Sequence, residues 1–569
     1  MSSPFAIRGV IEGFYGRLWS RTERERMIDF LGRHGYNLYV YAPKSDPLHR
    51  NRWQEPYLSE ELAYFAALDR RCREQSIQFV FGLSPLKLHY SDDGEMGALF
   101  AKLEAVYRLG VRSFMLLLDD MPDRFHYADD EARFGTVADA HVWLNNTVLA
   151  RLEAWGGVEH YLFCPTEYCG EGRSPYLERL GEGLRPEVHV LWTGPEVCSP
   201  RLTTADARVI SETLRRPVLY WENYPVNDLE MRWRPHIRPI RGRDADLGTV
   251  ALGIVANAAL QPEACKIPLH TYARYMADPA GYEPEAAWEQ ALLEVCGNEA
   301  DARAVAVLAD LARWSHLERG RQLYSRLAFI LNDFWRRWGG PPAATGPDLE
   351  GAPQPEERPP AVPALDIGLA AAHGDAAPTR NATTASCGEG PGPTPSAACR
   401  LALVDDMLGE FTRLHGVADR ILHSMANPWL KAELRPWAEK LAGWCDTAAL
   451  ALTVLRTALR DPAAPVLPAL RRDAVDRLWA TRENFHWVAG DLIDQFARRC
   501  LWAAEEVAAE AGTACCGAGC APVGAAGRAA GCGPGAAGGG SPGPAEGVHG
   551  VDSVRVGGDS APKGADADA

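Results

Sequence analysis

The chain has 569 residues, of which 47% are apolar and 24% are charged, so it exceeds an average domain in length and can bury a large core. Its formal net charge of −16 argues against non-specific attraction to nucleic acid or to an anionic membrane surface. No stretch approaches the roughly 20 consecutive apolar residues of a membrane span, and the first residues lack the basic and apolar regions of a secretory signal. These features predict a cytoplasmic protein without a nucleic-acid or membrane partner.

Short apolar runs alternate with amphipathic stretches over residues 1–285. The runs predict eight strands, at residues 6–11, 37–41, 77–82, 112–118, 159–163, 187–191, 217–221 and 249–255. Between them apolar residues recur at helical spacing, and several of these segments end in glycine, a common helix stop. Eight strand–helix repeats predict an α/β fold, a (β/α)8 TIM-type barrel. A doubly wound sheet is the competitor, but the first run opens into GVIEGFYG and not into a glycine-rich phosphate loop.

The rest of the chain divides by composition into helical blocks and segments that cannot form a core. Residues 286–340 and 401–510 show helical spacing and predict one all-α helical bundle domain in two parts. Residues 341–400 hold 12 of the 41 prolines and no aromatic residue, which predicts a disordered linker. Residues 511–569 hold 17 of the 53 glycines, again without an aromatic residue, and predict a disordered tail.

Polar and aromatic residues follow several of the predicted strands, and a barrel would gather them at the carboxyl ends of its strands, where active sites lie. The candidates are Gly9, Lys44, Asp119, Asp120, Tyr168, Trp221, Asn223, Asp228 and Asn257. Carboxylates, amides, an ammonium group and aromatic faces suit a polyhydroxylated ring, which needs polar partners for its hydroxyls and an aromatic platform for its apolar face. Metal-ligand spacing does not recur among them, so we expect no metal and no cofactor.

The run FMLLLDDMPD places Asp119 and Asp120 directly after an apolar strand. Adjacent carboxylates repel, so burial near each other would raise one pKa and keep a proton available for a leaving group. An isolated Asp-Asp pair is more often a solvated strand end or a helix N-cap. Paired aspartates also hold metal ions in nucleases and phosphatases. The pair alone leaves these alternatives open.

The usual glycosidase arrangement places its two carboxyl groups on opposite sides of the scissile bond, roughly 5–9.5 Å apart. Neighbouring acids on one loop would hardly reach opposite faces of a sugar. A third arrangement avoids this conflict: a 2-acetamido group on the substrate supplies the nucleophile, one Asp orients its N–H, and the other protonates the leaving oxygen. This geometry favours an N-acetylhexosaminidase, although paired Asp residues also serve metal sites.

Several segments, in order and spacing, resemble the catalytic barrel of glycoside hydrolase family 84, whose members are β-N-acetylglucosaminidases. They are RGVIEGFYGRLW, YVYAPKSDPLHR, FMLLLDDMPD, FCPTEYCG, LWTGPEV, YWENYPVND and the strand ending at Asn257. The resemblance covers about residues 5–275. It implies a retaining enzyme, similar to protein O-GlcNAcases, that hydrolyses terminal β-linked N-acetylglucosamine through an oxazoline intermediate, without a metal and without a covalent bond to the enzyme.

The resemblance also implies a role for each candidate residue. Asp119 would orient the acetamido N–H, and Asp120 would be the general acid and then the base that activates water. Tyr168 would hydrogen-bond the acetamido oxygen. The remaining candidates would bind the sugar: Asn223 and Trp221 around the acetamido group, and Asp228, Asn257, the backbone of Gly9 and the ammonium of Lys44 at the ring hydroxyls.

Without the resemblance, each candidate has a structural interpretation: Tyr168 and Trp221 could be core residues, Lys44 a surface charge, and Gly9 a residue of a turn. The sequence departs from the family pattern at Leu18, where members commonly have Pro, and at Ser45, where they have Asp. The alternatives are a hexosaminidase or hyaluronidase-type enzyme that acts on free glycans or cell-wall fragments, and a non-catalytic sugar-binding protein. By the same resemblance the helical region would pack against the barrel, and a homodimer through it is a further hypothesis.

Overall fold

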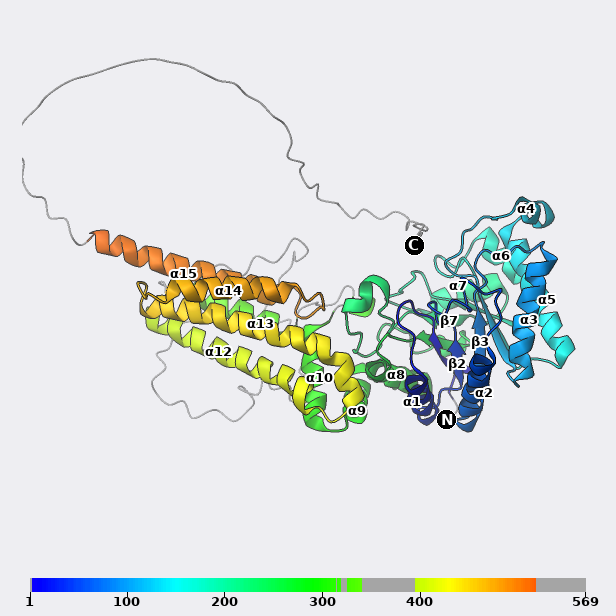
Figure 1. The fold of residues 1–569 in the computed structure, drawn as a ribbon, viewed down its shortest axis with the longest axis horizontal. Coiled ribbons are helices and arrows are strands. Elements are labelled where there is room, and N and C mark those ends of the chain that lie inside the picture. Colours follow the sequence, from blue (N-terminus) through cyan, green and yellow to red (C-terminus); the bar gives the residue numbers. More distant parts are fainter. Residues whose placement is uncertain (1–2, 314, 319–324, 340–394, 518–569) are drawn as a thin grey trace, which may run out of the picture. The chain divides into compact units, whose positions relative to one another are not determined.

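The computed structural model describes residues 3–313, 315–318, 325–339 and 395–517, and its first half is a closed barrel of eight parallel strands in sequence order (Figure 1). The strands are β1 (Ile7–Glu12), β2 (Leu38–Tyr41), β3 (Gln78–Leu83), β4 (Ser113–Leu117), β5 (His160–Cys164), β6 (Val188–Trp192), β7 (Leu219–Glu222) and β8 (Gly253–Asn257). The predicted barrel is confirmed. The largest difference is at β8, which begins four residues later than expected because Leu247–Thr249 form a short 3-10 helix, η2.

Helices cover the outside of the barrel. They are α1 (Arg21–Arg33), α2 (Ser59–Glu74), α3 (Asp93–Arg108), α4 (Ala128–Phe134), α5 (Val137–Trp155), α6 (Pro175–Gly183), α7 (Thr204–Leu214) and α8 (Pro262–Ala277). The expectation of a helix after every strand is wrong at one place. The stretch between β7 and β8 is described throughout and contains only the 3-10 helices η1 (Leu229–Trp233) and η2. Pro235, Pro239 and Gly242 in this connection oppose an α-helix.

Polar caps fix where several of the barrel helices begin. Ser20 and Glu23 form a capping box at α1, in which the Ser20 hydroxyl accepts from the Glu23 N–H and the Glu23 carboxylate accepts from the Ser20 N–H. Thr136 and Ser174 accept the same type of bond at α5 and α6. Because each such cap contributes about 1 kcal/mol, the polar residue before these helices helps to set the length of the preceding loop.

Two apolar clusters build the barrel. One fills its interior with strand side chains such as Ile11, Val40, Met115 and Leu191. The other, larger cluster lies between the strands and the surrounding helices. Both are nearly completely buried, so the strands form a rigid frame that holds the loops at their carboxyl ends.

A helical region follows the barrel and has an apolar cluster of its own. Its helices are α9 (Pro284–Cys296), α10 (Glu299–Leu311), α11 (Arg326–Trp338), α12 (Ala397–Asp419), α13 (Pro428–Arg460), α14 (Leu467–Arg482) and α15 (Leu492–Gly517), with a 3-10 turn, η3 (His316–Glu318), and a π-helical turn, η6 (Arg420–Ser424). The long helices α12, α13 and α14 run side by side, in that order (Figure 1). The all-α region expected after the barrel is confirmed.

Most of the two segments predicted to be disordered lies outside the described residues. At their edges the structure extends the helices: α12 begins at Ala397, inside the predicted linker, and α15 continues to Gly517, past the predicted start of the tail. Alanine is the strongest helix former, and the run of alanines up to Gly517 explains why low aromatic content alone placed the tail boundary too early.

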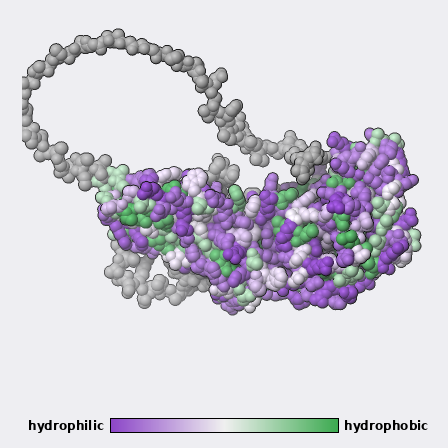
Figure 2. Space-filling view, in the orientation of Figure 1, coloured by the Kyte–Doolittle hydropathy of each residue, from purple (hydrophilic) through white to green (hydrophobic). Residues whose placement is uncertain are grey.

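Figure 2 shows a face on which hydrophilic residues predominate and apolar residues form scattered patches. Among the described residues, none of the helices is both long enough and apolar enough to cross a bilayer.

Candidate active site

The loops at the carboxyl ends of the strands bring together eight of the nine residues that the sequence singled out. The eight come from the carboxyl ends of β2, β4, β5, β7 and β8, and the loop after β1 adds Gly13 and Tyr15. Their side chains connect through hydrogen bonds and ion pairs into a carboxylate centre and an amide network, which are described in turn below. The exception is Gly9.

Asp119 is buried, and one of its carboxylate oxygens, Oδ2, pairs with the ammonium of Lys44, which is buried as well. Lys44 also lies 5.9 Å from the centre of the Trp221 ring. The other oxygen, Oδ1, is buried and makes no hydrogen bond to any described residue. Because buried acceptors are nearly always paired in folded proteins, this oxygen is suited to receive an N–H from a ligand.

Asp120 is exposed, and its two oxygens receive one phenol each. Tyr15 donates to Oδ2 and Tyr168 donates to Oδ1, both at 2.9 Å. The backbone of Asp120 has a φ of 54°, in the left-handed region that Asp tolerates better than most residues. Successive residues of an extended strand point to opposite faces, so this bend lets two neighbouring acids serve the same site.

Desolvation opposes ionisation of Asp120, but the ammonium of Lys44 and the hydrogen bonds from Tyr15 and Tyr168 outweigh it, so the pKa of Asp120 lies below its ordinary value. The expectation that one acid of the pair would have a raised pKa is therefore wrong for Asp120 in the ligand-free structure. Repulsion from the neighbouring acid is offset because Asp119 already has a cation as its partner. Burial, followed by the charge of Asp120, raises the pKa of Tyr15 and of Tyr168 well above 10.

An amide network forms the second part of the site. Asn223 Oδ1 accepts from Trp221 Nε1 at 2.8 Å and from Asn257 Nδ2 at 3.0 Å, and Asn223 Nδ2 donates to the carbonyl of Val197 at 2.8 Å. Asn257 Oδ1 in turn accepts from the N–H of Gly13 at 3.1 Å. These bonds fix both amides and the indole plane, so the orientation of each polar group is set before a ligand arrives.

Asp228 connects the loop after β7 to the loop after β1. Its Oδ2 accepts from the backbone N–H of Tyr15 at 2.8 Å. Burial, and to a smaller extent the charge of Asp120, raise its pKa above the ordinary value. Tyr15 therefore contacts Asp228 through its backbone and Asp120 through its hydroxyl, so one residue positions two carboxylates.

The prediction for Gly9 needs a correction. Gly9 lies within β1 and pairs with Leu38 on one side and Val255 on the other, so its backbone belongs to the sheet. A Cβ added there would meet the Leu38 side chain at 2.9 Å, which explains the glycine by packing. Gly13, four residues later, borders the site instead: a Cβ there would lie 2.5 Å from the Trp221 ring.

Tyr15 and Gly13 are the site residues to which the sequence gave no role. Both lie in the string EGFYG directly after the first strand, and an aromatic residue between glycines at a strand end was the available signal. Of the two departures from the family pattern, Ser45 accepts from the Gly16 N–H at 3.1 Å and so supports the same turn. Leu18 is 40% exposed.

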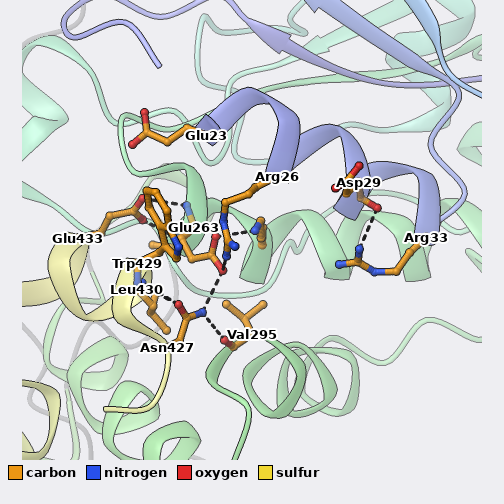
Figure 3. Close-up of polar contacts among 12 residues, drawn as sticks. Glu23, Arg26, Asp29, Arg33, Glu263, Val295, Asn427, Trp429, Leu430 and Glu433 are labelled. Atoms are coloured by element: carbon orange, nitrogen blue, oxygen red, sulfur yellow. Dashed lines mark hydrogen bonds and ion pairs between the residues drawn. The ribbon is translucent and has the colours of Figure 1, made fainter. Parts of the chain in front are cut away.

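A contact from the helical region reaches the start of α8, the helix that follows Asn257 and its loop (Figure 3). Helix α8 begins just after this loop and has no side-chain cap of its own. Glu433 of α13 supplies one, because its carboxylate accepts from the N–H groups of Glu263 at 3.0 Å and Ala264 at 2.8 Å. Asn427 donates to Glu263, which is also paired with Arg26. Helix α13 thus holds the first turn of α8 next to the site.

The donor set at the Asp pair is not a metal cluster. Among the described residues, side chains with metal-ligand spacing form two other groups, His34 with His270 and Glu294, and His89 with Asp129 and Asp130. The partners of Asp119 and Asp120 are an ammonium and two phenols. The ammonium of Lys44 lies on Asp119 where a metal ion would otherwise bind.

Comparison with known proteins identifies the family. A family model described as beta-N-acetylglucosaminidase matches residues 8–310, more than half of the chain. The chain belongs to this family. The resemblance to glycoside hydrolase family 84 is thereby confirmed, and the matched residues include all but the first residue of the barrel strands and every residue of the carboxylate centre and the amide network.

Individual relatives agree with this assignment. The protein O-GlcNAcases of rat and mouse are each 37% identical to the chain over 274 residues, which is 47% of this chain and 29% of theirs. The chain thus matches less than a third of the length of these curated relatives. A mutant O-GlcNAc hydrolase from Thermobaculum terrenum has a solved structure with a TM-score of 0.74 and 27% identity, covering 90% of this chain and 97% of that one.

Proposed function

We propose that this member of the family is a retaining β-N-acetylglucosaminidase, which removes terminal β-linked N-acetylglucosamine from glycosylated proteins with the help of the substrate's own acetamido group. The observation that carries the proposal is the buried, unpaired Oδ1 of Asp119 next to an exposed Asp120. One carboxylate is prepared to accept an N–H, and its neighbour faces the solvent from which a glycoside would enter. The names of the relatives support the same substrate class.

In the first step, Asp119 accepts the acetamido N–H through Oδ1 while Lys44 stays on Oδ2. The acetamido oxygen attacks the anomeric carbon and forms the C–O bond of an oxazolinium ion. The bond to the leaving oxygen breaks at the same carbon, and Asp120 donates its proton to that oxygen. The nitrogen keeps its proton, and the Asp119 carboxylate stabilises the positive charge that develops there.

In the second step, Asp120 removes a proton from water, the water oxygen attacks the anomeric carbon, and the oxazoline ring opens to restore the acetamido group. Two inversions at one carbon give net retention. The products are free N-acetylglucosamine and the hydroxyl of the aglycone, and the proton on Asp120 is regenerated, so the cycle closes without a redox partner.

A general acid must be protonated, whereas the ligand-free site lowers the pKa of Asp120. We infer that substrate binding reverses this shift. The Tyr168 hydroxyl has a single proton to donate, which now goes to Asp120; when it donates to the acetamido oxygen instead, Asp120 loses that bond. The loss of a hydrogen-bond donor raises the pKa of a carboxyl group, and so does the loss of the surrounding water. Substrate binding therefore favours the protonated form of Asp120.

The remaining side chains hold the sugar. Asp228 and Asn257 lie in adjoining loops and offer acceptors and a donor to ring hydroxyls, while the Trp221 ring and Asn223 surround the acetamido methyl and carbonyl. Lys44 has a second task beside Asp119, because its ammonium can donate to a hydroxyl as well. The backbone role first given to Gly9 is withdrawn.

The test is hydrolysis of a fluorogenic β-N-acetylglucosaminide, with EDTA present, by the wild type and by Asp119→Asn and Asp120→Asn. Asp123→Asn, on the same loop, is the matched control, and the β-glucoside is the control substrate. We expect cleavage of the N-acetyl substrate alone, unchanged in Asp123→Asn and collapsed in the two variants. A folded wild type that binds N-acetylglucosamine without cleaving it would favour a sugar-binding protein, and preference for polymers would favour a hyaluronidase-type enzyme.

We also propose a cytoplasmic location, a homodimer through the helical region, and a division of the chain near residues 285, 340, 400 and 510, with the last two adjusted to the start of α12 and the end of α15. The separate apolar clusters of the barrel and the helical region support the first of these boundaries. Sedimentation of the full chain tests the dimer, since a single species at the monomer mass would remove it.

A further inference from the structure

We propose that His34, His270 and Glu294 form a zinc site, distinct from the catalytic centre and independent of the proposed function. The three residues come from the end of α1, the middle of α8 and the end of α9. Their ligand atoms all lie within 4.8 Å of one another. No other group in the part of the chain that the structure describes combines two imidazoles with a carboxylate at this spacing.

The arrangement suits a tetrahedral ion. His34 Nε2 lies 2.8 Å from Glu294 Oε1, and His270 Nε2 lies 3.5 Å from Glu294 Oε2. Ligand atoms at the usual zinc distances of 2.0–2.1 Å are about 3.3 Å apart around a tetrahedron, and the two distances lie on either side of this value. Two His and one Glu are a common protein ligand set for zinc, with water as the fourth ligand.

The surroundings of the two rings favour a ligand as well. The imidazole centres are 4.9 Å apart, and both Nε2 atoms face the one carboxylate. Glu294 is partly exposed, which gives an ion access from solvent.

The position indicates a structural role. Only three residues separate His34 from the start of β2, so the cluster lies beside the amino end of that strand, whereas Asp119 and Asp120 follow the carboxyl end of β4. An ion here would link α1 and α8 of the barrel to α9, the first helix of the helical region. We therefore expect zinc to stabilise the fold and to leave hydrolysis unchanged.

The test is equilibrium dialysis of the metal-free full chain against Zn²⁺, followed by thermal unfolding with and without the ion. Glu294→Gln and His34→Gln keep partly exposed side chains of similar size, so both variants should fold. We expect the wild type to bind one zinc more than either variant, or to bind it at least about tenfold more tightly, and only the wild type to gain in Tm. His89→Ala, in the other cluster, is the matched control and should bind like the wild type.

Spectroscopy with Co²⁺ in place of zinc separates this site from the cysteines of the chain. Ligation by imidazole and carboxylate gives no thiolate-to-metal charge-transfer band. The proposal would be overturned if zinc binding were unchanged in Glu294→Gln and His34→Gln, or if it were lost in His89→Ala. A thiolate band when the chain binds a single ion would overturn it as well.

Discussion

The barrel and the helical region place their buried polar groups differently. In the barrel, one group of buried charges and amides, namely Lys44, Asp119, Asn227, Asp228 and Asn257, lies together at the carboxyl ends of the strands, whereas others, such as Asp69 and Asn145, lie singly on the outer helices. In the helical region, buried polar groups such as Asp301, Glu410 and Lys440 are spread over separate helices. Burying a polar group costs free energy unless it is paired, so a concentration of such groups indicates a ligand site, whereas scattered ones serve packing and helix ends.

The largest expected effect tests the barrel side of this comparison. Asp120→Asn removes the proposed acid, so hydrolysis of a substrate with a poor leaving group, an N-acetylglucosamine on a serine peptide, should fall by about 10² to 10⁴-fold. An activated aryl glycoside needs less proton donation and should lose much less. Steady-state rates on both substrates check the prediction, and an equal loss on both would mean that Asp120 is not the acid.

Lys44→Met should come next, because it leaves the Asp119 carboxylate buried without its cation. Breaking a buried pair in this way costs about 3–5 kcal/mol of folding free energy. Urea unfolding at neutral pH measures the loss, with the exposed Lys87→Met as the control for removing a lysine. A loss of less than about 1 kcal/mol in the free energy of unfolding would show that Asp119 is solvated. The clustering of buried polar groups would then distinguish the barrel from the helical region less clearly.

Tyr15→Phe should have a smaller effect, on pH dependence more than on rate. The Tyr15 hydroxyl stabilises the carboxylate form of Asp120, so its removal raises the pKa of Asp120. Activity that requires protonated Asp120 is lost as pH rises through that pKa, and the basic limb of the kcat profile, which reports the substrate complex, should therefore move to higher pH. A basic limb that stays in place or moves to lower pH would remove Tyr15 from the account.

The smallest effect concerns the contact between the two regions. Burial raises the pKa of Glu433 to about 7, above the ordinary value of about 4.3, so the folded protein keeps a proton that the unfolded chain has lost. The contribution of Glu433 to the free energy of unfolding is therefore fully present below about pH 4 and is lost as the pH rises to about 7. Glu433→Gln cannot titrate, so its stability relative to the wild type should rise over this interval.

Urea unfolding of both proteins at several pH values measures that difference, and Glu439→Gln, on the same helix, provides the control. A difference between Glu433→Gln and the wild type that does not change with pH would show that the carboxylate is already ionised in the folded state.

The features that could be predicted from the sequence are those that depend on residues close together in the chain. The strands were found because alternation and helix caps are local, and the Asp pair stood out because two acids after an apolar run are unusual. Gly9 was misplaced because a strand glycine and a ligand-facing glycine look alike until neighbouring strands define which Cβ would clash. Glu433 was missed because its partner at the start of α8 is about 170 residues away in the sequence.

The most direct test of substrate assistance is the rate of hydrolysis for a series of aryl glycosides whose N-acyl group carries none, one, two or three fluorine atoms. If the acetamido oxygen is the nucleophile, each fluorine withdraws electrons from it, and kcat/KM should fall steeply along the series, with the β-configured product released first. Rates that are independent of fluorination would contradict the account, because the nucleophile would then belong to the enzyme or to water.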